Sequence, residues 1–178
     1  AVVIWMADSD GTIARNLARH LGLVMVNSGA MYRAVTWKIL SLGIDPLDQH
    51  SVEQALEKMI IGCGVDGCFS TIAIDGVVLH DELRSQQVNQ AVSIVSAIPL
   101  VRERLVALQR DYLQRTSVVM EGRDIGSVVF PDTPYKIYVD ASAEVRAARR
   151  SAEGVSDSVV ARDQADSARA TAPLLVAK

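Results

Sequence analysis

The sequence predicts an α/β fold in which a parallel β-sheet is covered by helices and carries a small inserted antiparallel β patch. Apolar runs alternate with helical patterns along most of the chain, which is typical of parallel sheets with helices on both faces. A Gly-rich stretch between residues 57 and 95 interrupts that alternation. The 178 residues suffice for one domain with an inserted subdomain, and folding at that size buries roughly 70% of the chain surface.

The first unit is a strand, a loop and a helix. Val2–Met6 is an apolar run, residues 7–12 are polar, and Ile13, Leu17 and Leu21 then recur at helical spacing. This order is typical of a phosphate cradle, because a helix N-terminus presents backbone donors to an anion. The loop nevertheless holds one glycine, no lysine and two aspartates.

The second unit has the same organisation. Leu23–Val26 is a short apolar strand, and the turn Asn27–Gly29 offers good N-cap chemistry. A helix is expected over Ala30–Leu42, where Gly43 ends it, and residues 51–59 predict a further helix.

The inserted patch is predicted as three short strands: Met59–Gly62, Phe69–Ile74 and Val77–Leu79. The Asp-Gly pairs at 66–67 and 75–76 are hairpin signals. We therefore expect an antiparallel patch here.

After this patch, strands and helices are again predicted to alternate. The predicted helices cover 86–115, 143–152 and 157–170, and the predicted strands cover 117–120 and 135–141. Three polar loops, 7–12, 27–29 and 121–126, follow predicted parallel strands. Ligands in such sheets bind at the carboxyl ends of the strands, so we expect these loops to converge on one site.

The composition excludes several classes of function. The net charge of −3 argues against a general nucleic-acid binder, and 49% hydrophobic residues argue against disorder. The chain has no apolar run of about 18 residues that would predict a membrane span. Cys63 and Cys68 form neither a zinc pattern nor a convincing disulfide, so we expect a reduced, cytoplasmic setting. The isolated histidines have no metal-ligand spacing.

The stretch NSGAMYR combines Ser28 in a loop with Arg33 one helical turn into the following helix. A helix N-terminus with a nearby guanidinium suits a phosphate monoester. On these residues alone, an N-cap serine and a surface arginine are the simpler interpretation.

The stretch EGRDIG places Glu121, Arg123 and Asp124 after a buried strand. Charged groups at the carboxyl edge of a sheet are costly to bury unless they are used, so we favour a functional role over a surface turn with a local ion pair.

The stretch ARDQADSARA projects Arg162, Asp166 and Arg169 from one helical face. Asp166 could simply bridge its neighbours. With the arginines at 146, 149 and 150, the pattern favours an arginine-rich lid that neutralises a transferring phosphoryl group.

Together these stretches resemble the bacterial cytidylate (CMP) kinase family. NSGAMYRAVTW is similar to its D-[ST]-G-A-M-Y-R motif, EGRDIGSVVFPDTPYKIYVDASAEVRAARR to its signature, and RDQADSARATAPL to its lid run. The resemblance covers residues 12–178. It implies a P-loop nucleoside monophosphate kinase fold with a core domain at 1–56 and 96–178, a lid near 150–170, and a nucleotide-monophosphate-binding insert at 57–95.

The resemblance also implies roles for individual residues. The positions expected to bind the CMP or dCMP acceptor are Ser28, Arg33, Ser93, Arg110, Asp124, Arg162, Asp166 and Arg169. The donor ATP, with Mg²⁺, is expected at Ser9, Asp10, Gly11, Thr12 and Arg149, and the catalytic arginines are expected to be Arg123, Arg162 and Arg169. No metal ligand can be assigned, and a monomer that binds neither membrane nor nucleic acid is expected.

The sequence departs from the family pattern in four places. Asn27 stands where the family usually has aspartate, and Asp10 stands where its loop lysine is expected. An aspartate there reverses the sign of a contact worth about 4 kcal/mol near a phosphate, which should cripple ATP binding. The lid stretch is short and the chain stops at Lys178. A trimmed form of a longer protein explains the odd loop, the lid and the terminus together, and we favour that interpretation.

Three functions remain open at this point. The leading hypothesis is a cytidylate kinase that transfers the γ-phosphoryl group of ATP to CMP or dCMP. The alternative is a catalytically impaired CMP-binding homologue with a degenerate P-loop, and a weaker option is a kinase for UMP or AMP.

Overall fold

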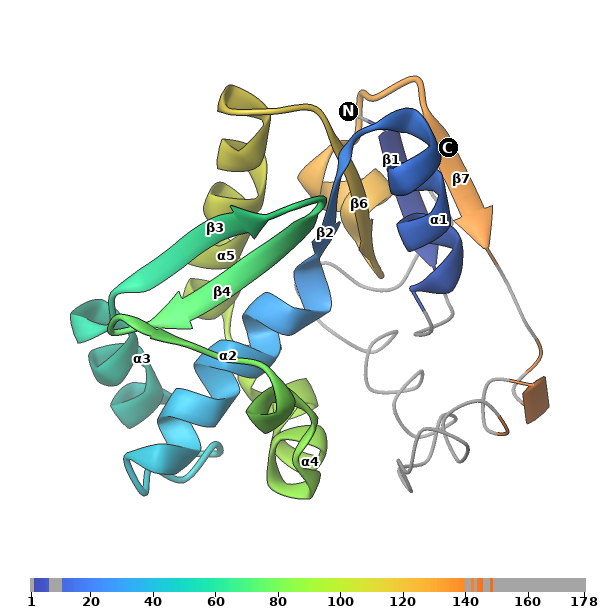
Figure 1. Cartoon of the computed structure of the whole chain (residues 1–178). Helices are drawn as coiled ribbons and strands as arrows, with labels where there is room; N and C mark the ends of the chain where they lie inside the picture. The colour runs from blue at the N-terminus through green and yellow to red at the C-terminus, as the bar shows by residue number, and fades with distance from the viewer. Residues whose placement is uncertain (1, 7–10, 140–141, 143, 146–147, 149–178) are drawn as a thin grey trace.

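The computed structural model describes residues 2–6, 11–139, 142, 144–145 and 148, and its described strands form one sheet (Figure 1). The strand order is β3-β4-β2-β6-β1-β7, and β5 pairs with β4. The strands are β1 (Val2–Met6), β2 (Val24–Asn27), β3 (Ile61–Asp66), β4 (Phe69–Ile74), β5 (Val77–Val78), β6 (Val118–Gly122) and β7 (Lys136–Val139).

The helical elements cover this sheet. The α-helices are α1 (Thr12–Leu21), α2 (Ser28–Ser41), α3 (Gln49–Lys58), α4 (Gln86–Val95) and α5 (Pro99–Asp111). Shorter turns are the 3₁₀ helices η1 (Asp81–Arg84) and η2 (Tyr112–Gln114) and the π-helix η3 (Ile125–Val129).

The strands β2, β6, β1 and β7 run parallel to one another, with β7 at the edge, whereas β3 and β5 are antiparallel to β4. The predicted parallel sheet with an inserted antiparallel patch is therefore confirmed. The patch is joined to the parallel part through one residue pair, Met25 with Phe69.

The parallel strands bury opposite faces against different helices, because successive side chains of a strand point to opposite sides. Met25 and Val119 pack with Ala14 and Ala18 of α1. Val26, Val118 and Met120 pack instead with Tyr112 of η2 and with η3. The sheet is thus covered on both faces, as the continuous apolar strands predict.

The largest buried cluster lies between the hairpin β3-β4 and helices α2 to α5, and it includes Val35, Ile39, Leu56, Ile74 and Leu105. The inserted hairpin is therefore part of a shared core with the helices.

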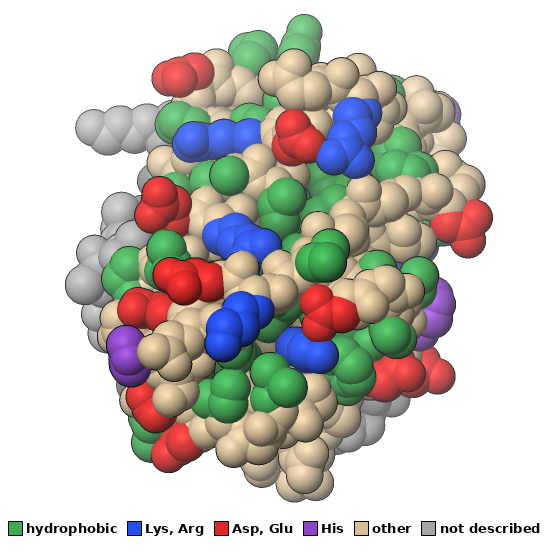
Figure 2. Space-filling model, turned by 90° about the vertical axis from the view of Figure 1, so that its left-hand side faces the viewer, with side chains coloured by type: hydrophobic (Ala, Val, Ile, Leu, Met, Phe, Trp, Pro, Cys, Tyr) green, Lys and Arg blue, Asp and Glu red, His purple; other side chains and the backbone are tan. Residues whose placement is uncertain are grey.

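Over this side of the molecule, Figure 2 shows basic and acidic side chains interspersed, with no large surface of one sign.

Several predicted boundaries are corrected by the structure. The second helix begins at Ser28 because Asn27 is its N-cap, with Oδ1 accepting the Ala30 N–H at 3.0 Å. The strand predicted over 117–120 continues to Gly122, so Glu121 belongs to β6 and is not a loop residue. The long helix ends at Asp111 and continues only as the 3₁₀ turn η2.

The predicted lid near 150–170 lies outside the described residues. Among the residues that are described, no helix is long and apolar enough to span a membrane.

Candidate active site

The carboxyl end of β6 meets the N-terminus of α2. Ser28 is buried, and its Oγ donates a hydrogen bond to the Glu121 carbonyl oxygen at 2.8 Å. A Cβ added to Gly122 would lie 2.1 Å from Ser28 Oγ. Only glycine permits this close approach, so segments 27–29 and 121–126, predicted as loops, meet where β6 ends and α2 begins.

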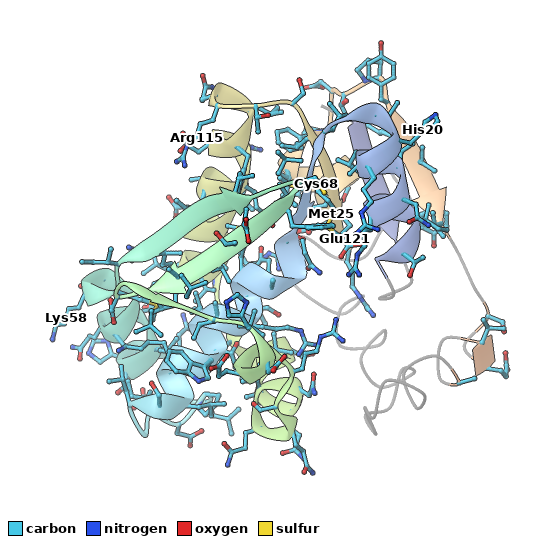
Figure 3. All side chains as sticks on the ribbon, in the orientation of Figure 1. His20, Met25, Lys58, Cys68, Arg115 and Glu121 are labelled. Atoms are coloured by element: carbon cyan, nitrogen blue, oxygen red, sulfur yellow. The ribbon has the colours of Figure 1, made fainter. Side chains whose placement is uncertain are left out.

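The loop before α1 reaches the same place through Gly11. This residue has a left-handed backbone, with φ of 63°, which favours glycine. A Cβ added there would lie 2.9 Å from Glu121 Oε2, so Gly11 rests against the buried Glu121 carboxylate (Figure 3 labels Glu121). Gly11, the described end of the first predicted loop, therefore lies with segments 27–29 and 121–126 at the carboxyl end of β6.

Asp124, just beyond β6, forms a buried ion pair with Arg102 of α5. The Arg102 side chain is 3% exposed, its Nη1 donates to the Ser96 carbonyl oxygen at 3.1 Å, and its guanidinium lies 5.4 Å from the centre of the Tyr32 ring. Arg102 Nε has no hydrogen-bond partner among the described residues. Asp124, the Ser96 carbonyl and the Tyr32 ring thus hold the guanidinium in place, and its Nε is available to donate to a ligand.

Arg110, in contrast, does not lie with Asp124. Its Nε and Nη2 donate to the carbonyl oxygens of Val129 and Val128, both at 2.9 Å. It lines a pocket of about 560 Å³ that also includes Leu113 and Asp132.

None of these contacts involves Ser28 or Asp124, so the structure does not join Arg110 to the two residues with which it was expected to share a cleft. Arg110 lies where α5 leads, through η2, to the start of β6, and Figure 3 shows Arg115, near this end, well away from Glu121. Sequence reasoning missed Arg102. The available signal was the position of Arg102, which stands at helical spacing from the apolar residues Ile98 and Leu105; all three are buried.

Arg33 projects from α2 toward η1 and α4. Its Nη1 donates to the Leu83 carbonyl oxygen at 3.0 Å and to Asn89 Oδ1. Ser93 lies half-buried one turn beyond Asn89 on α4, which packs against α2. Arg33 and Ser93 therefore lie on two helices, α2 and α4, that pack against each other.

Of the remaining predicted site residues, Thr12 is the exposed first residue of α1, and Arg123 is half-buried between Gly122 and Asp124. The other predicted positions lie outside the described residues: Ser9, Asp10, Arg149, Arg162, Asp166 and Arg169.

Burial raises the pKa of the Cys63 thiol and of the Tyr112 phenol. Both groups are therefore neutral near pH 7, and Tyr112 Oη donates to the Gly64 carbonyl oxygen at 3.2 Å. A neutral, half-buried thiol is a poor nucleophile, so neither group suggests covalent catalysis.

Within the described part of the chain, no cluster of three or more His, Cys, Asp or Glu side chains could hold a metal ion by itself. Among the described residues, the Glu121 carboxylate lies against Gly11, the neighbour of Thr12. Carboxylate and hydroxyl oxygens are the hard ligands that Mg²⁺ accepts, usually together with substrate phosphates and water. These residues fit a magnesium ion shared with a bound nucleotide.

A glycine turn before a helix, and buried charges at the carboxyl edge of a parallel sheet, define the class: a nucleotide-binding α/β protein with a phosphate cradle. The sequence model of the family described as "Cytidylate kinase" matches residues 7–178. The cytidylate kinase of Mycobacterium leprae is 45% identical over 179 residues, which cover 94% of this chain and 78% of the relative. That of Streptomyces coelicolor is 42% identical over 187 residues, covering 98% and 81%.

The chain belongs to the cytidylate kinase family, and it is accordingly a nucleoside monophosphate kinase. The matched region includes the predicted loop at residues 7–12 and the predicted lid.

Proposed function

We propose that the protein transfers the γ-phosphoryl group of ATP to CMP or dCMP. The observation that supports this most strongly is the buried pair of Arg102 and Asp124, just beyond the carboxyl end of β6. A carboxylate accepts hydrogen bonds from an amino group, and a guanidinium donates to a ring nitrogen or carbonyl. Cytosine presents an amino group beside a ring nitrogen and a carbonyl oxygen on one edge, whereas uracil has a carbonyl in place of the amino group.

This pair suits base recognition because it is already removed from water. A base that leaves a buried polar group unpaired is strongly rejected, often by a factor of 10⁴ or more. In this proposal Asp124 accepts from the amino group and Arg102 uses its unpartnered Nε or a neighbouring nitrogen. Arg102 thereby replaces Arg110 as the expected base-binding arginine, and Ser28 and Ser93 remain proposed ligands of the nucleotide.

Phosphate recognition is proposed for arginines on both sides of the transfer. Arg33 binds the acceptor phosphate, and Asp166 accepts from the ribose hydroxyls. The residues proposed to neutralise the transferring group are Arg123, Arg162 and Arg169, and those proposed to hold the donor are Ser9, Asp10, Gly11, Thr12 and Arg149. The insert at 57–95 and the lid at 150–170 are proposed to enclose the two nucleotides against the core at 1–56 and 96–178.

Magnesium would be held by Thr12 and Glu121 with the donor phosphates, where it would neutralise negative charge on the β- and γ-phosphates. The protein residues act by position and charge. Phosphoryl transfer of this kind needs aligned reactants and dispersed charge more than a covalent intermediate. We further propose a cytoplasmic monomer.

A panel of acceptors tests the proposal. The purified protein is given MgATP with CMP, dCMP, UMP or AMP, and ADP release is followed by a coupled assay. We expect CMP and dCMP to be preferred over UMP by at least 100-fold in kcat/KM. Preference for UMP, or calorimetric binding of CMP without ADP release, would contradict the proposal.

A further inference from the structure

A second pocket lies where α5 and η2 approach the chain beyond η3. Its volume is about 560 Å³, and volumes of roughly 300–1,000 Å³ are typical of small-molecule sites. The residues that line it are two charged side chains and otherwise mostly apolar ones: Arg110, Leu113, Val129, Phe130, Pro131, Asp132 and Thr133. None of them is proposed above to bind CMP or ATP, so this pocket is open to another ligand.

Arg110 brings a positive charge to the pocket. Its Nε and Nη2 donate to the carbonyl oxygens of Val129 and Val128, both at 2.9 Å, and these acceptors carry no net charge. Among the described residues, Arg110 takes part in no ion pair. The backbone therefore fixes the orientation of the guanidinium while its charge stays available for an anionic group of a ligand.

Asp132 brings the opposite charge to the same pocket. This residue is exposed, and its carboxylate, like the guanidinium of Arg110, forms no ion pair within the described part of the chain. A cation and an anion thus line one pocket without pairing with each other. Such an arrangement suits a ligand that carries both charges, because each protein group then meets its complement.

The remaining lining of the pocket is largely apolar. Leu113 is 37% exposed although its side chain is entirely aliphatic, and Phe130 is half-buried. A ligand with an apolar body removes such surface from water and gains affinity by doing so.

We propose that this pocket binds an α-amino acid with an apolar side chain, in its zwitterionic form. The carboxylate of the ligand pairs with Arg110, its ammonium group pairs with Asp132, and its side chain contacts Leu113 and Phe130. A nucleotide fits less well, because its phosphate adds negative charge beside Asp132. The inference goes beyond phosphoryl transfer and does not depend on it.

A series of three ligands tests the proposal on the parent protein. L-phenylalanine is the probe, 3-phenylpropionate lacks its ammonium group, and 2-phenylethylamine lacks its carboxylate. Binding is followed by the backbone amide signals of Leu113, Phe130 and Asp132 in nuclear magnetic resonance spectra. We expect L-phenylalanine to shift these signals with a Kd of about 1–10 mM, since both charge contacts are exposed to water. Each of the other two ligands should bind at least about threefold more weakly.

Two substitutions assign the charges to their partners. Asp132→Asn should weaken L-phenylalanine binding about threefold and should strengthen binding of 3-phenylpropionate, because a repulsive carboxylate is removed. Arg110→Met should weaken L-phenylalanine binding by a similar factor and strengthen binding of 2-phenylethylamine. The matched control is Arg115→Met, since Arg115 is also exposed and donates to a backbone carbonyl, that of Cys63 at 3.1 Å. This control should change the Kd for L-phenylalanine less than twofold.

The opposite responses of the truncated ligands separate charge recognition from a general loss of structure, which would weaken all three ligands together. Equal affinity for the three ligands, or unshifted signals at ten times the expected Kd, would overturn the inference. Displacement of L-phenylalanine by CMP would also overturn it, because the pocket would then belong to the nucleotide. The kinase activity is tested separately by the panel of acceptors, so failure of one proposal leaves the other standing.

Discussion

Arg102 and Arg110 lie two turns apart on the same helix, in opposite environments. Arg102 is buried against Asp124, whereas Arg110 is exposed and donates to two backbone carbonyls. At 100° per residue, eight residues rotate the second side chain about 80° from the first, onto another face of α5. A buried guanidinium requires a charged partner, and an exposed one can be satisfied by the ends of a loop. Burial, more than the mere presence of an arginine, therefore identifies the candidate site.

The largest effect is expected from Arg102→Leu. This substitution removes the buried ion pair between Arg102 and Asp124, which should lower the free energy of unfolding by about 3–5 kcal/mol. We also expect kcat/KM for CMP to fall at least 1000-fold, because the base loses its donor. Urea unfolding and the coupled assay measure the two effects separately.

The double variant Arg102→Leu with Asp124→Leu serves as the control for folding. Apolar residues in place of both charges should restore much of the stability but none of the activity. A double variant that still prefers CMP over UMP would show that the pair does not recognise the base.

Gly122→Ala should produce the next largest effect. Its Cβ would lie 2.1 Å from Ser28 Oγ and 2.9 Å from Ile125 Cδ1, so it should lower the free energy of unfolding by about 1–3 kcal/mol and weaken CMP binding. Gly62→Ala is the matched control, because its nearest neighbour, the Ala73 Cβ, lies at an ordinary 3.5 Å. Equal stability of the two alanine variants in urea would contradict the close approach.

Arg110→Leu tests the other end of the comparison. It removes two hydrogen bonds to backbone carbonyls, which should cost about 1 kcal/mol in the free energy of unfolding. Because Arg110 does not contact Asp124 or Ser28, kcat/KM for CMP should remain within twofold of the parent value. A loss of kcat/KM for CMP comparable to that of Arg102→Leu would show that Arg110 takes part in binding CMP.

The smallest expected effect concerns pH. Hydrogen bonds from Lys38 and from the Ile60 N–H hold the pKa of Asp75 below its usual value. A depressed carboxyl pKa contributes stability above the pKa of the unfolded chain, and this contribution is lost as the pH falls through the folded value. Asp75→Asn should therefore be slightly less stable at pH 7 and show a weaker fall in melting temperature below about pH 4. A melting temperature whose dependence on pH matches that of the parent would contradict this.

Much of the fold was predictable because its signals are local. The span of β4, Phe69–Ile74, was predicted without error, since two Asp-Gly turns bound it. The strands β2 and β6 were found within one or two residues from their apolar runs alone. The convergence of the loops was also predictable, because parallel strands end at one edge of the sheet.

By itself, then, the sequence determined the order of strands and helices, the family motifs and the expected acceptor-binding positions. Tertiary structure decided which arginine accompanies Asp124, that Glu121 lies inside a strand, and that Asn89 holds Arg33. The physical reason is the range of the interactions. Periodicity and turns depend on neighbours along the chain, whereas burial and the pairing of a charge depend on residues that only folding brings together.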